Sequence, residues 1–128
     1  MTHTGRGVFK STTDGTTYDG EYAHGLRHGA ARFTFQDGSW FEGNFRDGER
    51  DGFGREFYGG SGKLRYEGRF KGDRFGGQGR FYWADGSSVE GEFVNGLVNG
   101  RARKTAPDGT VVFQGEFRDG TPVGRNEL

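Results

Sequence analysis

The side chains that could do chemistry in this chain are three histidines, many carboxylates and one glycine-rich string. His24 and His28 share one short segment and His3 is remote from them, so no third ligand stands nearby to complete a metal site. The string Gly59–Lys63 is similar to a phosphate-binding loop, but Leu64 stands where serine or threonine would hold magnesium. Cysteine is absent, which excludes thiolate catalysis. We therefore expect no catalytic residue, no metal site, no cofactor and no enzymatic activity.

The composition excludes further classes of function. Lys and Arg number 18 against 18 Asp and Glu, so there is no basic footprint and nucleic acid is not an expected partner. No apolar stretch approaches the length of a membrane-spanning helix. Glycine makes up 27 of 128 residues, about three times the usual share, yet 20 residues are aromatic. We expect a folded cytoplasmic protein, with association to the cytoskeleton or to a membrane left open.

A repeat of about 23 residues accounts for the glycine. Five segments have a glycine at their centre. Two residues before this glycine stands an aromatic residue or valine, and two residues after it stands an aromatic residue. The central glycines are Gly20, Gly43, Gly68, Gly91 and Gly115. Another glycine follows nine residues after each of them. The carboxylates recur at repeat positions too, which favours pairing within a sheet over a unique acid–base pair. We expect one domain over 1–128, with a partial repeat at 5–17, repeats from 18, 41, 66, 89 and 113, and a stub at 122–128.

Inside each unit, residue types alternate with a period of two, which predicts β-strands. Asp-Gly, Asn-Gly and His-Gly pairs between them predict tight hairpin turns, and the whole predicts an all-β antiparallel meander of about ten strands. Gly72 comes one place early, which predicts a different turn type there. One expected register places Glu21 opposite Arg32; it also places Glu92 opposite Arg103 and Arg69 opposite Arg80.

These segments resemble the MORN repeat (membrane occupation and recognition nexus), with the pattern Y-x-G-x-[WF] followed by a second strand and an Asp-Gly or Asn-Gly turn. The resemblance runs from Gly5 to about Gly124. It implies a scaffold or adaptor, with phospholipid binding proposed for some members. The unit that begins at Val89 departs from the pattern, since Ala102 and Lys104 occupy positions where glycine and an aromatic residue are expected. The aromatic surface is therefore expected to weaken in the C-terminal third.

Strand parity places 15 of the 20 aromatic residues on one face, together with the aligned glycines. We expect a flat layer of rings on a single sheet that curls into a trough, with no second layer to cover them. Such a trough suits an extended or helical segment of another protein. The residues expected to bind this partner are Tyr22, Phe33, Phe35, Phe45, Tyr58, Phe70, Phe81 and Trp83.

The opposite face is expected to be charged, and it supports a second hypothesis, peripheral binding to acidic phospholipids such as phosphoinositides. The residues expected to contact lipid are Arg69, Arg80, Arg101, Arg103 and Lys104. A sheet of this kind also has two unpaired edges, expected near Gly7 and near Phe117, through which copies could associate. A third hypothesis, ranked last, treats the chain as a targeting module of a larger enzyme.

Overall fold

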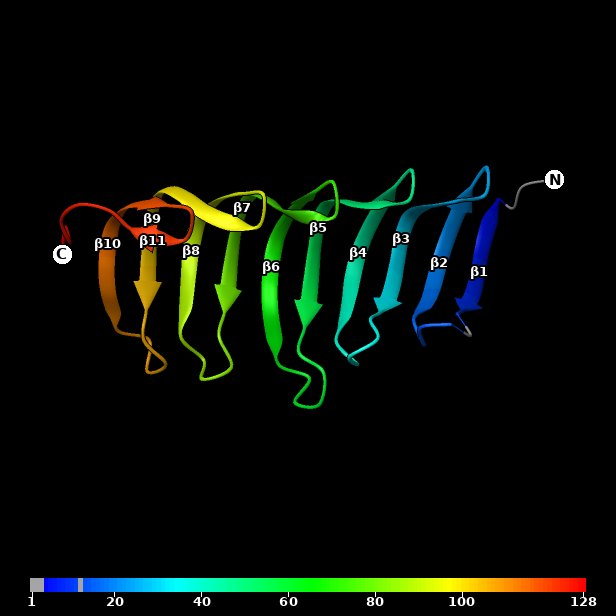
Figure 1. The fold of residues 1–128 in the computed structure, drawn as a ribbon, viewed down its shortest axis with the longest axis horizontal. Helices are drawn as coiled ribbons and strands as arrows, with labels where there is room; N and C mark the ends of the chain where they lie inside the picture. Colours follow the sequence, from blue (N-terminus) through cyan, green and yellow to red (C-terminus); the bar gives the residue numbers. More distant parts are fainter. Residues whose placement is uncertain (1–3, 12) are drawn as a thin grey trace.

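The computed structural model describes residues 4–11 and 13–128, which form one open antiparallel sheet of eleven strands. Each strand pairs with its neighbours in sequence, so the two chain ends lie at opposite ends of the sheet (Figure 1). The strands are β1 (Gly5–Lys10), β2 (Thr17–Ala23), β3 (Leu26–Thr34), β4 (Trp40–Arg46), β5 (Glu49–Phe57), β6 (Leu64–Lys71), β7 (Arg74–Tyr82), β8 (Ser88–Val94), β9 (Leu97–Thr105), β10 (Val111–Arg118) and β11 (Thr121–Pro122). The expected all-β meander is confirmed. Within the described residues, no helix is long and apolar enough to cross a membrane.

Five hairpins close through two-residue turns in which both residues have positive φ, as in the type I′ turn. Four of these turns end in glycine, at residues 24–25, 47–48, 95–96 and 119–120. In the turn between β6 and β7 the order is reversed, with Gly72 at φ 55° and Asp73 at φ 69°. The prediction of a different turn type there is wrong, because aspartate tolerates the left-handed region that glycine otherwise occupies.

A bulge follows the turn in β3, β5, β7 and β9 and sets the register of the sheet. In β3, residues 28–30 lie opposite the single residue Glu21, and Gly29 has a φ of 85°. Glycine recurs at this bulge position because the backbone there is left-handed. The tight turn and the bulge together place Arg32 opposite Asp19. The expected pairing of Arg32 with Glu21 is therefore wrong by two residues.

The same shift corrects the other expected pairs and produces a ladder of alternating charge on the outer face, the face away from the ring-bearing inner face. Across the sheet this ladder reads Asp19, Arg32, Glu42, Arg55, Glu67, Arg80, Glu90 and Arg103. Arg80 thus lies opposite Glu67 and Arg103 opposite Glu90, not opposite Arg69 and Glu92. Each exposed pair contributes at most about 1 kcal/mol, and together the pairs favour this register.

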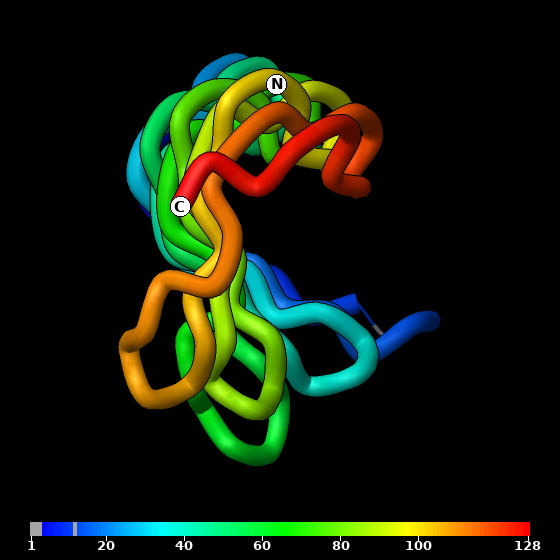
Figure 2. Tube along the Cα trace, turned by 90° about the vertical axis from the view of Figure 1, so that its left-hand side faces the viewer, coloured from blue at the N-terminus to red at the C-terminus, as the bar shows by residue number. Residues whose placement is uncertain are grey.

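The strands bend sharply at a row of small residues that crosses the inner face. This row reads Gly7, Gly20, Ala31, Gly43, Gly54, Gly68, Gly79, Gly91, Ala102 and Gly115. Side chains four residues apart in a straight strand are separated by about 13 Å. The ring centroids of Phe41 and Phe45 are nevertheless 5.5 Å apart, and those of Tyr66 and Phe70 are 5.1 Å apart. The sheet is consequently C-shaped in cross-section (Figure 2).

Rings occupy the space that the missing side chains leave. A Cβ added at Gly54 would collide with the ring of Phe41. In the next unit a Cβ added at Gly79 would collide with the ring of Tyr66, whose hydroxyl donates to the Arg69 carbonyl at 2.8 Å. Burial raises the pKa of Tyr66, and it raises the pKa of Tyr18 to about 12. Strand parity predicts that the rings and the aligned glycines share one face, and in the structure the rings lie over those glycines.

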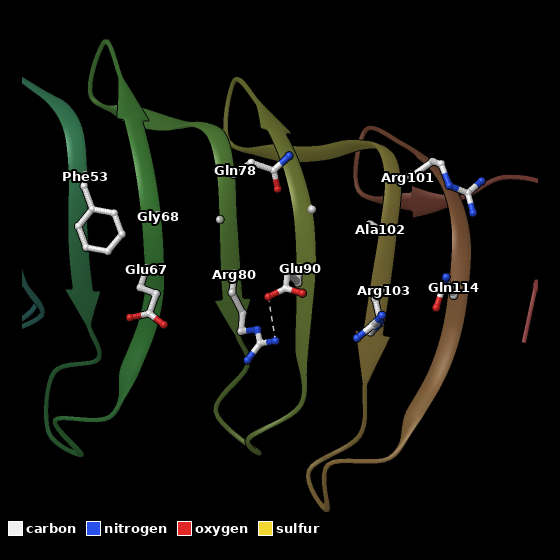
Figure 3. A pocket seen from close by; sticks show the side chains of 12 residues that line it. Phe53, Glu67, Gly68, Gln78, Arg80, Glu90, Arg101, Ala102, Arg103 and Gln114 are labelled. Atoms are coloured by element: carbon white, nitrogen blue, oxygen red, sulfur yellow. Dashed lines mark ion pairs between the residues drawn. The ribbon is translucent and has the colours of Figure 1, made fainter.

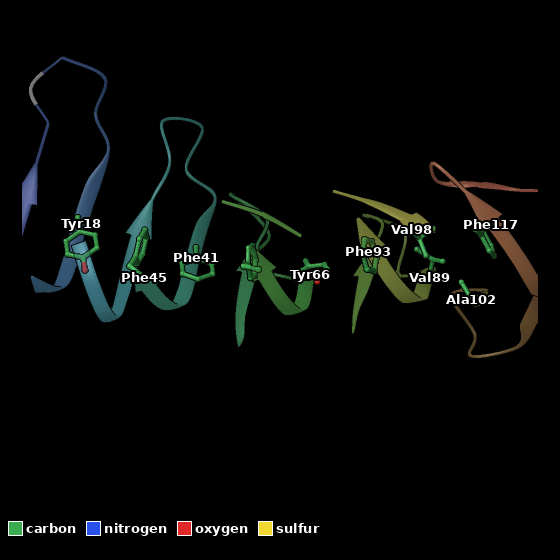
Figure 4. Close-up of a cluster of buried hydrophobic side chains, with 10 residues drawn as sticks. Tyr18, Phe41, Phe45, Tyr66, Val89, Phe93, Val98, Ala102 and Phe117 are labelled. Carbon is green, nitrogen blue, oxygen red and sulfur yellow. The ribbon is translucent and has the colours of Figure 1, made fainter. Parts of the chain in front are cut away.

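The core is a ridge of side chains that runs the length of the sheet inside the bend (Figure 4). Its buried members are Tyr18, Phe41, Phe45, Tyr66, Phe70, Val89, Phe93, Val98, Ala102 and Phe117. The expected flat layer is wrong in this respect, because the bend brings the rings from both ends of a strand into edge-to-face contact. In the unit that begins at Val89, Val89 and Lys104 stand where most other units have rings, so the ring layer weakens there as expected, while Phe93 and Phe117 remain in the core.

The two edges of the sheet are treated differently. β1 has no further strand beside it in the described residues, as expected near Gly7. Near Phe117, the chain turns back as β11 and continues along β10. There the Val123 and Glu127 amides donate to the Glu116 and Gln114 carbonyls at 2.9 and 2.8 Å. The expectation of an unpaired edge near Phe117 is therefore wrong, because the last residues of the chain cover it.

Candidate protein-binding groove

The inside of the C forms a groove whose walls are side chains from the second strand of each unit. Phe33, Phe35, Tyr58 and Phe81 are half-buried there, and Trp83 is 41% exposed. Of the other residues expected to bind a partner, Phe45 and Phe70 are buried in the core and Tyr22 is half-buried against Tyr18. Of the residues predicted to bind a partner, those that remain accessible in the groove are the ones that come from the second strand of each unit or directly follow it.

Two arginines in the N-terminal half of the groove were missed by the sequence reasoning. The Arg27 guanidinium lies 5.9, 5.3 and 5.0 Å from the ring centroids of Tyr18, Phe33 and Phe45. Arg50 lies in the same way over Phe35, Phe41 and Phe70. The sequence does contain a signal for this placement. Across a two-residue turn, residue i lies opposite residue i+5, and each arginine stands five residues after the second aromatic residue of its unit. Each arginine is therefore expected to face the same side as that aromatic residue.

Arg50 belongs to a partly buried ionic cluster. Its Nη1 lies 2.7 Å from Glu56 Oε1, and the Arg65 Nε lies 2.9 Å from Glu56 Oε2. Asp73 approaches the Arg50 Nε at 3.5 Å and accepts from the Arg50 amide at 2.8 Å. Glu56 is only 6% exposed and stands at the repeat position that Phe33 and Phe81 fill in other units. This cluster makes the N-terminal half of the groove polar.

The C-terminal half carries apolar residues at the same repeat positions. Phe75 replaces arginine and stacks on Tyr66, with ring centroids 3.8 Å apart, and Val98 replaces arginine one unit later. A hollow of about 280 Å³ lies beside them. Its walls include Phe75, Phe81, Trp83, Val98, Lys104 and Phe117. The C-terminal half of the groove is therefore lined mainly by apolar side chains.

The residues expected to contact lipid divide between the two faces. Lys104 lies on the inner face, with its Nζ 5.3 Å from the Trp83 ring, so its assignment to the charged outer face is wrong. The reason is parity, because Lys104 pairs with Val89 and Phe113, which both face inward. Arg69 lies on the outer face, in the bulge region beside Gly77.

The outer face has a shallow hollow of about 490 Å³, which is lined by Arg80, Arg101 and Arg103 among others (Figure 3). It follows the small-residue row, where the bend of the strands spreads the outer side chains apart. Arg80 forms an ion pair with Glu90 at 2.8 Å, and Arg101 forms ion pairs with Glu116 at 3.7 Å and with Glu127. Within the described ranges Arg103 has no ion pair of its own, although Glu90 lies opposite it.

Two carboxylates form hydrogen bonds within the loops at the rim opposite the two-residue turns. The Asp37 carboxylate accepts from the Ser39 hydroxyl and amide, and these bonds hold the pKa of Asp37 below its usual value. Asp85 does the same with Ser87 in its loop. The part of the chain that the structure describes contains no cluster of three metal-ligating side chains. His3 lies outside the described residues.

Comparison with known families agrees with this geometry. The MORN repeat model matches five consecutive segments, at residues 18–40, 41–64, 66–88, 90–111 and 113–125. The chain belongs to the MORN repeat family. MORN repeats are non-catalytic modules for interaction with proteins or membranes. In this chain, the MORN repeats share one bent backbone, and the side chains along the groove differ from unit to unit.

Proposed function

We propose that this MORN-repeat chain is a non-enzymatic scaffold that binds an extended or helical segment of another protein along the groove. The observation that carries the proposal is the exposed Trp83 beside the apolar hollow, on the concave side of a sheet with no second layer in the described residues. A large contiguous apolar patch that remains exposed on a folded monomer usually marks an interaction site. The groove is long, open and lined by adjacent rings, which suits a linear segment.

Binding to acidic phospholipid through the outer face has weaker support. Two of the arginines expected to contact lipid are already in ion pairs, Arg80 with Glu90 and Arg101 with Glu116 and Glu127. The ladder alternates in sign, so an anionic surface would meet a carboxylate beside each arginine. Vesicle co-sedimentation with and without phosphoinositide separates the two functions, and salt-sensitive binding lost in Arg103→Glu would favour the membrane.

Site-specific photo-crosslinking tests the groove directly. A benzophenone side chain replaces Trp83 in one variant and Phe53 in a matched control, because Phe53 is 50% exposed and lies on the outer face. After irradiation in lysate of the source cell, we expect a discrete adduct at position 83 and none at position 53, with the partner identified by mass spectrometry. An adduct at position 53 alone, or equal labelling at both positions, would place the binding surface elsewhere.

A further inference from the structure

The repeat provides an internal comparison for Arg27. Arg27 and Arg50 occupy the same position in consecutive units, and each donates from Nη2 to a backbone carbonyl of the next turn. The distances are 2.7 Å to the Gly48 carbonyl for Arg27 and 2.6 Å to the Asp73 carbonyl for Arg50. The Gly48 and Asp73 amides in turn donate to the carbonyls of Arg27 and Arg50. The two arginines therefore have the same backbone setting.

They differ in their carboxylates. Arg50 has two carboxylate partners, Glu56 at 2.7 Å and Asp73 at 3.5 Å. In the unit of Arg27, Phe33 stands at the position of Glu56 and Gly48 at the position of Asp73. Among the described residues, Arg27 has no ion pair. A half-buried guanidinium with rings beneath it keeps further N–H donors for a planar acceptor such as a carboxylate.

The space beside Arg27 is accessible. Arg27, Phe33 and Phe35 line an inner-face hollow of about 610 Å³ that Arg50 also lines. Two carboxylates, those of Asp14 and Asp37, also line this hollow, and both accept hydrogen bonds within their own loops. A third carboxylate, that of Asp73, is held by Arg50. Among the described residues, none of these carboxylates forms an ion pair with Arg27.

We propose that Arg27 binds a carboxylate of the partner segment and so sets the direction in which that segment lies in the groove. The inference rests on the proposed function, because it assigns the partner's chemistry at the same groove. The segment has an acidic side chain at the end over β3 and a large apolar side chain at the end over β7–β10, in the hollow beside Trp83. Five strand spacings separate the two positions, about 24 Å, which a helix covers in about 16 residues and an extended chain in about 7.

The experiment uses a display library of random peptides of about 20 residues, long enough to cover the groove in either conformation. The full chain is the target, and the peptides that it enriches are synthesised and their Kd values measured. Arg27→Gln removes the charge and keeps hydrogen-bonding capacity. The matched control is Arg46→Gln, because Arg46 is an exposed outer-face arginine of β4. Circular dichroism and a urea titration establish that each variant is folded.

We expect the enriched peptides to share an acidic residue near one end and aromatic or leucine residues near the other. Changing that acid to its amide weakens binding to the wild type by about tenfold or more, as expected for loss of a charged hydrogen bond. The same peptide change has little effect on Arg27→Gln, and Arg46→Gln binds as the wild type does. Phe33→Glu supplies an internal carboxylate at the position of Glu56, and it weakens the acidic peptides more than their amide versions.

The outcomes separate the two proposals. Peptides whose binding survives Trp83→Ser do not use the groove, and that result overturns the proposed function. Peptides that need Trp83 but show no preference for an acid, or none lost in Arg27→Gln, overturn the role of Arg27 and leave the groove in place. A phosphoserine peptide that binds more than tenfold tighter than its glutamate version would overturn the carboxylate assignment in favour of a phosphorylated partner.

Discussion

The N-terminal and C-terminal halves of the groove have the same backbone and different chemistry. In both, the strands bend at the small-residue row and the ring of the first strand lies over it. The two halves differ in the side chain that lies across the turn from the second aromatic residue of the first strand. In the first two units this residue is arginine, Arg27 and Arg50, and in the next two it is apolar, Phe75 and Val98. Backbone shape in this fold is set by glycines and turns, so the groove-facing positions are available for specificity.

The comparison also shows how a charge enters the core of such a sheet. Glu56 takes a position that is aromatic in the units before and after it, and it is buried with Arg50 and Arg65 around it. A buried carboxylate is costly unless it is paired, and here the pairing is supplied by residues of two adjacent strands. The polar half thus depends on a set of residues that must be present together, whereas the apolar half depends on independent contacts.

The largest expected effect tests what the halves share. Phe41→Ala in the polar half and Tyr66→Ala in the apolar half each remove a fully buried ring, so each should lower the free energy of unfolding by about 3–5 kcal/mol. Urea titration followed by far-UV circular dichroism measures both. Tyr66→Phe is the control, since it keeps the ring and loses the hydrogen bond to the Arg69 carbonyl, at a cost of about 1 kcal/mol. A much smaller loss in Phe41→Ala would mean that charge, not rings, stabilises the polar half.

A second prediction concerns the ionic cluster. Glu56→Gln leaves Arg50 and Arg65 facing an uncharged amide, and we expect a loss of about 2–4 kcal/mol in the free energy of unfolding. The matched control is Glu42→Gln, which removes an exposed outer-face carboxylate and should cost less than about 1 kcal/mol.

The double variant Arg50→Phe/Glu56→Phe copies the arrangement of Phe75 and Phe81 into the polar half, and it should recover most of the loss caused by Glu56→Gln. If the double variant is as unstable as Glu56→Gln, the two halves are not interchangeable at these positions.

Strands, tight turns and rings over glycines could all be predicted from the sequence, because alternation and Asp-Gly pairs are local signals. The register of the sheet could not be predicted, because it depends on the bulge at Gly29 and at the equivalent positions of the other units. The bulge adds residues to one strand while the alternation of residue types along the sequence continues unbroken. The same bulge explains why Arg27 and Arg50 were missed. These two arginines lie between the turn and the bulge, so the turn determines that they face inward. Alternation counted from the residues after the bulge does not show it.

Lys104 shows a different limit. Its charge indicates a solvated surface, and the two arginines shortly before it in sequence, Arg101 and Arg103, do lie on the outer face. Strand parity places Lys104 inside, where the adjacent Trp83 ring accommodates the ammonium group. For Lys104, the side-chain type indicates the wrong face and the position in the repeat indicates the correct one.

A third prediction uses pH to probe the buried tyrosines. Burial raises the pKa of Tyr18 to about 12 in the folded protein, against about 10 in an unfolded chain. The folded state therefore keeps its proton where the unfolded state loses it, and stability should fall as the pH rises from about 10 to about 12. Urea midpoints across this range measure the fall. Tyr18→Phe should make the fall shallower, and a further reduction is expected in Tyr18→Phe/Tyr66→Phe, because the pKa of Tyr66 is raised too.

The smallest effect concerns the reversed turn. Exchanging Gly72 and Asp73 produces the Asp-Gly order that the turn at 47–48 has, which favours the type I′ turn itself. It also removes the carboxylate that accepts from the Arg50 amide and approaches its guanidinium. We expect a net loss of about 0.5–1 kcal/mol by urea titration, because the ion pair and the hydrogen bond outweigh the turn preference. A gain in stability would show that the turn preference outweighs the contacts of Asp73 with Arg50. The difference between Arg27 and Arg50 would then rest mainly on Glu56.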